Sequence, residues 1–144
     1  MKTLFSLHAL FVATAVLEAF YTVAALLTPP DLVYPLFGWS MTADGHWALK
    51  LLGVALGAQA LTAWVLRRDP PVAVAYCLAT YQIGATVVDI VLWQMLADQG
   101  IFAAPTARAM ILAAIPTHFV LGVLLCAAVV RAGHQTRAAP SHAR

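Results

Sequence analysis

The feature that most constrains this chain is a series of four long apolar stretches, divided by short polar or proline-rich segments. Each stretch is close to the ~20 residues that an α-helix needs to cross the hydrocarbon core of a bilayer. The four predicted helices cover residues 3–28, 47–66, 72–97 and 107–130. The sequence therefore predicts an all-α fold: an integral membrane bundle of four transmembrane helices within residues 1–131, followed by a mobile polar tail at 132–144.

The composition indicates the same medium. Of the 144 residues, 62% are hydrophobic and 10% are charged, whereas soluble domains are about half apolar and about a quarter charged. A domain of this size cannot hide so much apolar surface from water. The basic residues lie almost entirely at the ends of the apolar stretches and form no stripe interleaved with aromatic residues, so we expect no nucleic-acid partner.

Proline and capping residues set the expected helix ends. The first helix ends at Pro29 because proline lacks an N–H donor and restricts the residue before it. Thr42 or Asp44 can cap the second helix. The link between the second and third helices is short, which predicts that these two helices are antiparallel neighbours.

The positions of lysine and arginine predict the orientation in the membrane. Six of the eight fall on one side of an even-span topology, namely Lys2, Arg67, Arg68, Arg131, Arg137 and Arg144. Only Lys50 and Arg108 fall toward the other side. Because cationic loops resist translocation, both termini are expected in the cytoplasm.

The segment between the first and second helices, residues 29–46, has two possible roles. Its centre, residues 32–39, is too apolar for a solvated loop and too short to span a membrane. It either lies in the headgroup plane or folds back as a lid over the bundle.

The ionisable residues inside the predicted spans that matter most for function are Glu18, Lys50, Asp89 and His118. Such residues cost about 2.5–3.5 kcal/mol each on insertion scales and normally face the bundle interior. At a rise of ~1.5 Å per residue, three of them lie roughly 12–16 Å below the outer helix ends and share one layer. Lys50 lies nearer the surface, and its long side chain can reach up to water or down to a carboxylate.

Helical spacing extends this layer into polar faces. Residues at i, i+3, i+4 and i+7 share a helix face, which adds Tyr21, Gln82 and Trp93 to the acidic positions. The predicted ligand-binding set is Glu18, Tyr21, Lys50, Gln82, Asp89, Trp93 and His118, and the catalytic candidates are Glu18, Asp89 and His118. The alternative is structural: ion pairs within the layer that fix the helix register.

Two glycines predict a site of close helix packing. Gly53 and Gly57 form a GxxxG motif on the second helix, which lets another backbone approach closely. The cysteines, Cys77 and Cys126, stand singly within apolar runs, so neither a redox motif nor a metal-ligand spacing is present. We expect no metal and no cofactor.

The first half of the chain resembles a known family. An apolar helix that ends at prolines is followed by Leu36-Phe37-Gly38, an acidic turn at Asp44, and Leu49-Lys50-Leu51-Leu52-Gly53 at the start of a helix rich in small residues. This pattern resembles the small four-helix bacterial membrane proteins of the DoxX-like kind. The resemblance implies a four-helix bundle in the bacterial inner membrane, and some members of that family are subunits of quinone-linked complexes.

Three functions from different classes fit these observations. The first is a non-catalytic binding or accessory subunit that docks partner helices, lipid or a quinone-like apolar ligand, with a partner membrane protein or a second copy as a possible partner. The second is a membrane-embedded isomerase or hydratase that acts on an apolar substrate through Glu18 and Asp89. The third is a proton-coupled transporter, which needs a dimer because four helices rarely enclose a pathway.

Overall fold

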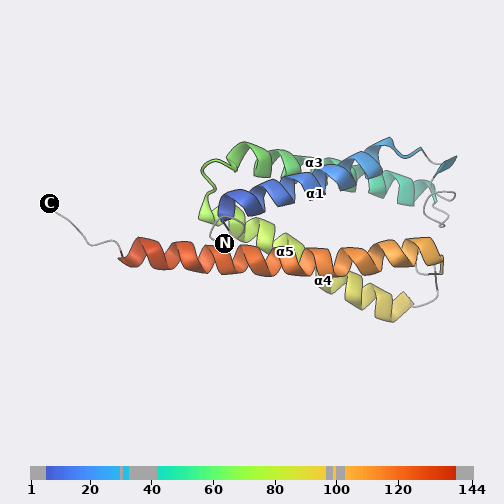
Figure 1. Ribbon diagram of the computed structural model, residues 1–144. Helices are drawn as coiled ribbons and strands as arrows, with labels where there is room; N and C mark the ends of the chain where they lie inside the picture. The colour runs from blue at the N-terminus through green and yellow to red at the C-terminus, as the bar shows by residue number, and fades with distance from the viewer. Residues whose placement is uncertain (1–5, 30, 33–41, 97–98, 100–102, 139–144) are drawn as a thin grey trace.

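The computed structural model describes residues 6–29, 31–32, 42–96, 99 and 103–138. In this part of the chain four helices are long and apolar enough to cross a membrane (Figure 1). They are α1 (Leu7–Leu27), α3 (Ala43–Leu66), α4 (Val72–Leu96) and α5 (Pro105–Ala138). The predicted all-α class and the four apolar helices are confirmed.

The helix ends differ from the predicted spans by a few residues at most places and by more at the C-terminus. Thr42 caps α3, since its hydroxyl accepts a hydrogen bond from the Gly45 N–H at 3.2 Å, so α3 begins before position 47. Ser6 caps α1 in the same way through the Ala9 N–H. Helix α5 continues through Pro116 to Ala138, so residues 132–138 extend this helix, and 139–144 lie outside the described residues.

The helices pack as two pairs. Helix α1 lies along α3 and α4 lies along α5, while α1 makes fewer contacts with α5 and α4 (Figure 1). The expectation that the second and third helices pack as neighbours is wrong, because α3 has hardly any contact with α4. A short link at residues 67–71 fixes only where two helix ends lie, and it leaves the helices free to separate along their length.

Glycines explain why these particular helices pair. A Cβ atom at Gly53 would lie 2.9 Å from the Leu26 side chain, and one at Gly57 would lie 3.2 Å from Thr22. Gly122 plays the same part in the other pair, because its Cβ would lie 2.7 Å from Cδ1 of Ile83. The GxxxG face is therefore covered by α1 and is not free for a partner helix.

The buried apolar core lies toward one end of the bundle, which we call the joined end. It combines the first half of α1 and α4 with the last half of α3 and α5. Its members are Leu10, Phe11, Ala15, Ala63, Ala75, Leu78, Ala79, Leu121, Leu125, Ala128 and Val129. His8 ties α1 to α3 at this end, since its Nδ1–H donates to the Arg67 carbonyl at 2.6 Å.

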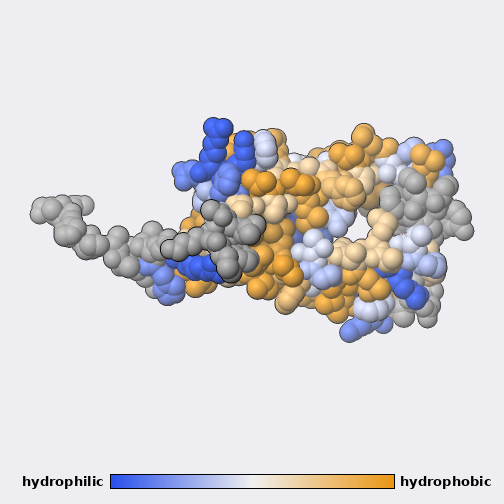
Figure 2. Space-filling view, in the orientation of Figure 1, coloured by the Kyte–Doolittle hydropathy of each residue, from blue (hydrophilic) through white to orange (hydrophobic). Residues whose placement is uncertain are grey.

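The outer surface between the two ends is apolar. Large hydrophobic side chains such as Val16, Leu61 and Phe119 are more than half exposed. Figure 2 shows hydrophobic residues over the middle of the molecule and hydrophilic residues gathered toward its ends. Such a belt matches the hydrocarbon of a bilayer, and the chain is a multi-pass membrane protein.

Candidate functional site

A cavity of about 600 Å³ lies between the two helix pairs, toward the end opposite the joined end. We call this end, which carries Leu27, Ala43, Leu96 and Pro105, the open end. All four helices line the cavity, and its volume is typical of small-molecule sites. Its lining is Phe20, Tyr21, Ala24, Ala25, Leu49, Leu52, Leu56, Tyr81, Ala85, Val88, Asp89, Ala107, Met110, Ile111, Ala114 and His118.

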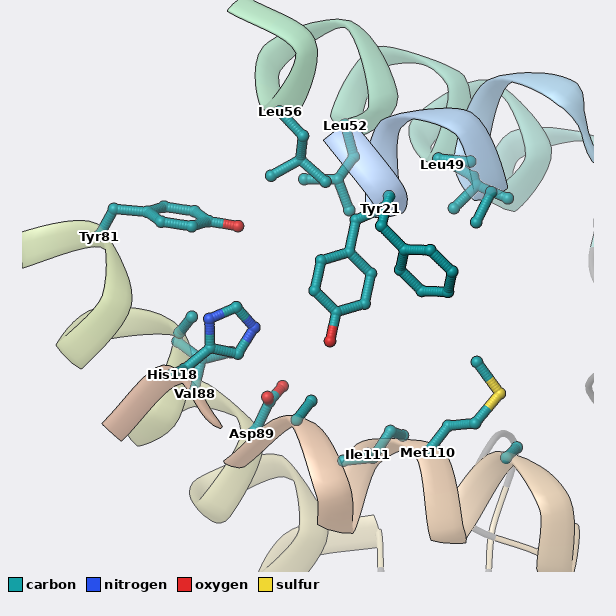
Figure 3. Close-up of a pocket in the computed structure, with 16 residues that line it drawn as sticks. Tyr21, Leu49, Leu52, Leu56, Tyr81, Val88, Asp89, Met110, Ile111 and His118 are labelled. Carbon is teal, nitrogen blue, oxygen red and sulfur yellow. The ribbon is translucent and has the colours of Figure 1, made fainter. Parts of the chain in front are cut away.

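Most of the cavity wall is apolar. Leu49, Leu52 and Leu56 follow one another at helical spacing on α3 and form one wall (Figure 3). Met110 and Ile111 of α5 lie across from them. The alanines among the lining residues occupy positions where larger side chains would fill the space.

The polar groups of the cavity gather around His118. The imidazole stacks on Tyr21 with ring centroids 5.8 Å apart, and it meets the ring of Tyr81 edge-on at 6.2 Å. Figure 3 shows His118, Asp89 and both tyrosine hydroxyls directed into the cavity from three helices. The cavity therefore has apolar walls and one polar end.

Behind this polar end lies a buried chain of hydrogen bonds. Glu18 of α1 and Gln82 of α4 are both fully buried. The Gln82 amide donates from Nε2 to Oε1 of Glu18 at 2.6 Å, and its own Oε1 bonds to Nδ1 of His118. Three helices are thus linked through one amide side chain, which fixes the imidazole that faces the cavity.

One carboxylate oxygen of Glu18 takes no part in this series of hydrogen bonds. This oxygen, Oε2, is buried and has no hydrogen-bond partner among the described residues. A buried acceptor without a partner costs about 1–3 kcal/mol, so this position is expensive to maintain. Two other buried polar residues avoid this cost: Thr14 and Thr86 donate to the carbonyls of Leu10 and Gln82 in their own helices.

The predicted layer of Glu18, Asp89 and His118 is present only in part. Glu18 and His118 are joined, but through Gln82 and not directly. Asp89 is half-buried and lines the cavity beside His118, and none of the hydrogen bonds among the described residues involves its carboxylate. Glu18 lies behind Gln82 and is not part of the cavity lining, so it does not meet a ligand as the sequence had indicated.

Lys50 has a different partner from the one expected. Its Nζ donates to the carbonyls of Ala25, Leu26 and Thr28 at 2.8–3.0 Å, and so it caps the end of α1. Lys50 shares a face with Gly53, and the packing of that face on α1 brings the ammonium to the last turn of the helix. There the unpaired carbonyls and the negative end of the helix dipole attract it away from the carboxylates.

Two more predicted ligand-binding residues, Gln82 and Trp93, do not line the cavity. Gln82 is fully buried and is the central link of the hydrogen-bond chain, and Trp93 lies near the surface. Its side chain is 38% exposed, one turn beyond Asp89 on α4. Tyr81 was not predicted to be in the site, although the sequence carries a signal for it: Tyr81, Ala85 and Asp89 follow one another at a spacing of four residues, so they share a face of α4.

The donor set of the site does not resemble a metal centre. Among the described residues, no group of three His, Cys, Asp or Glu side chains gathers closely enough to hold an ion. Comparisons with models of known protein families, with curated proteins and with solved structures found no match for this chain.

Proposed function

We propose that this protein is a non-catalytic membrane binding protein that takes a lipid-like or quinone-like molecule from the bilayer into the cavity between its two helix pairs. The observation that carries this proposal is the cavity itself, which combines apolar walls from four helices with one polar end at His118 and Asp89. Apolar ligands with a single polar group need both features in one site.

The loose contact between the pairs supports entry from the membrane. Helix α3 has hardly any contact with α4 or α5, so helix packing does not close the cavity between Leu52 on one pair and Met110 on the other. Both side chains are nearly half exposed. A molecule dissolved in the bilayer would therefore reach the cavity sideways without crossing water.

The free-energy cost of keeping an ionisable side chain at the polar end of the cavity, inside the membrane, also supports a binding function. Ionisable side chains inside a membrane are expensive unless they are paired. A helix bundle that needed only stability would keep apolar residues at position 89, whose carboxylate lacks a hydrogen bond within the described residues. A ligand with a polar group would offset part of that cost.

The proposed setting is the bacterial inner membrane with both termini in the cytoplasm. The joined end carries Arg67 and Arg68, and the guanidinium of Arg67 lies 3.7 Å from the centre of the Trp64 ring, an arrangement suited to a membrane interface. On this orientation the cavity lies toward the outer leaflet. The DoxX-like resemblance, the accessory-subunit role and the transporter hypothesis stay predictions.

The test is to fill the cavity. Ala114 lines the cavity, whereas its neighbour Ala113 is exposed on the outer face of α5, so Ala114→Trp and Ala113→Trp form a matched pair. The full chain and both variants are purified in mild detergent, and bound small molecules are identified by mass spectrometry. We expect the wild type and Ala113→Trp to retain a discrete apolar molecule that Ala114→Trp loses. The proposal fails if all three carry the same bulk lipids.

A second candidate function is a membrane-embedded isomerase, and one observation favours it. The imidazole of His118, oriented by Gln82 and Glu18, faces the same cavity as the Asp89 carboxyl group. A base so placed can remove a proton from one carbon of a bound alkene and, once protonated, return it to another carbon, which moves a double bond without a cofactor. This role falls to His118, beside Asp89, and not to Glu18.

Solvent exchange separates this enzyme from a binding protein. The purified protein is incubated in deuterated water with the apolar molecules that copurify with it. An isomerase would place deuterium on carbon in those molecules, and His118→Phe would abolish the incorporation. Absence of carbon-bound deuterium above a protein-free control would exclude the isomerase and leave the binding function intact.

A further inference from the structure

We infer that the ligand of the cavity presents a hydrogen-bond donor, a hydroxyl or an ammonium group, to His118 and Asp89. This inference rests on the proposed binding function and specifies the chemical class of the ligand. It excludes molecules whose polar group only accepts hydrogen bonds, such as ethers and oxidised quinones.

The first step is the orientation of the Gln82 amide. A carboxylate accepts hydrogen bonds and does not donate them, so the amide nitrogen of Gln82 faces Glu18. The amide oxygen then faces His118. Both Glu18 and Gln82 are fully buried, so this hydrogen bond is shielded from competing water.

The second step is the tautomer of His118. An amide oxygen accepts a hydrogen bond, so the Nδ1 atom that contacts it carries the hydrogen. In a neutral imidazole the other nitrogen, Nε2, is then the acceptor. The ring projects into the cavity with this second nitrogen on the cavity side (Figure 3). The buried Glu18–Gln82 pair therefore presets His118 as an acceptor toward a ligand.

The third step is the balance of donors and acceptors at the polar end. Asp89 adds two acceptor oxygens, and among the described residues that line the cavity the side-chain donors at this end are the hydroxyls of Tyr21 and Tyr81. Of the described residues that line the cavity, none is a lysine or an arginine. Lys50, the cation of the predicted ligand-binding set, uses three donated hydrogen bonds on the end of α1. Acceptors thus outnumber donors, and a donating ligand completes the set.

The apolar walls define the rest of the ligand. Leu49, Leu52 and Met110 extend from the polar end toward the open end. A molecule that fits has its donor group deep in the bundle and its apolar part directed toward the surrounding lipid. A long-chain alcohol, a phenol or an alkylamine has this form.

The experiment compares three matched probes on the full chain in lipid nanodiscs. They are a long-chain alkylphenol, the methyl ether of the same phenol, and the alkylbenzylammonium of the same chain length. Binding is measured by quenching of the protein's tryptophan fluorescence with brominated probes. We expect at least one donor probe to bind about tenfold or more tightly than the ether, the ratio expected for one well-placed hydrogen bond.

Two variants test whether His118 and Asp89 cause the difference in affinity between the donor probes and the ether. His118→Phe keeps an aromatic ring beside Tyr21 and removes the acceptor, so the phenol should fall to the affinity of the ether while the ether is unchanged. Asp89→Asn, at a half-buried position that tolerates a polar side chain, should weaken the ammonium probe more than the phenol. Should His118→Phe fail to fold, the Asp89→Asn comparison and the probe ratios on the wild type still decide the outcome.

The outcomes separate this inference from the function on which it rests. A preference for the phenol identifies a neutral hydroxyl ligand, and a stronger preference for the ammonium that Asp89→Asn removes identifies a cationic amphiphile; both support the inference. Equal binding of ether and phenol overturns it while leaving the proposed function in place. If no probe binds and Ala114→Trp leaves the copurified molecules unchanged, the proposed function itself is overturned.

Discussion

The joined end and the open end are built from the same four helices and yet differ in how closely the two helix pairs pack against each other. At the joined end, Phe11 and Leu125 are fully buried among small residues from all four helices. At the open end the helices keep their partners within each pair but leave a cavity of about 600 Å³ between the pairs. The comparison indicates that one end holds the bundle together and the other is available to a ligand.

The border between the two ends is a polar layer. Glu18, Gln82 and His118 lie where the apolar core stops and the cavity begins. In a membrane such bonds are costly to break, because lipid offers no replacement donors or acceptors. The layer therefore orients the cavity-facing imidazole and also connects both helix pairs.

The largest expected effect comes from a matched pair of phenylalanines on α1. Phe11 is 0% exposed at the joined end and Phe20 is 64% exposed beside the cavity. Phe11→Ala should lower the free energy of unfolding by about 3–5 kcal/mol, since it opens a void in the core. Phe20→Ala should change it by less than about 1 kcal/mol. Thermal unfolding in detergent measures both, and equal losses would contradict the division into two ends.

A smaller effect is expected from glycines in the second helix pair. Gly122→Val should cost about 1–3 kcal/mol, because its Cβ would lie 2.7 Å from Ile83 and force α4 and α5 apart. Gly84→Ala is the control, since nothing lies within 4 Å of its Cβ position. Circular dichroism during thermal unfolding distinguishes them, and a stable Gly122→Val protein would show that this approach does not set the pairing.

The polar layer should respond to loss of its buried acid. Glu18→Ala removes the acceptor of the Gln82 amide, and leaving that buried donor unpaired should cost about 1–3 kcal/mol. Because the amide is then free to turn, His118 should also lose its fixed orientation. The phenol and ammonium probes should then no longer bind more tightly than the ether. Retained stability together with retained probe selectivity would show that Glu18 does not position the imidazole.

The smallest effect is expected at the open end of the first pair. Lys50→Met keeps the aliphatic part of the side chain and removes the ammonium that caps the last carbonyls of α1. We expect a loss of about 0.3–1 kcal/mol, typical of a charge at a helix end. Hydrogen exchange of the last turn of α1 should rise, with no change around Phe11 at the joined end. A change in ligand binding as large as that of Ala114→Trp would place Lys50 in the site after all.

The sequence predicted those features of the candidate site that depend only on how deep a residue lies in the membrane. Counting residues from the helix ends put Glu18, Asp89 and His118 at similar depths, and two of them are linked in the structure. Rotation about the helix axis was harder to predict, since Gln82 and Tyr81 are adjacent yet belong to different faces of α4. Gln82 joins the buried chain while Tyr81 faces the cavity, and only the neighbouring helices distinguish the two.

The sequence by itself determined that the chain forms four apolar helices, and it indicated nearly where each begins. These properties are local, because a transmembrane helix satisfies its own backbone hydrogen bonds and its ends are set by nearby prolines and caps such as Thr42. Only the tertiary structure decided that α1 pairs with α3 and α4 with α5, that Lys50 caps α1, and that a cavity lies between the pairs. The physical reason is that pairing depends on close approach between residues far apart in the chain, as at Gly53 and Leu26, and many pairings satisfy the same pattern of apolar residues.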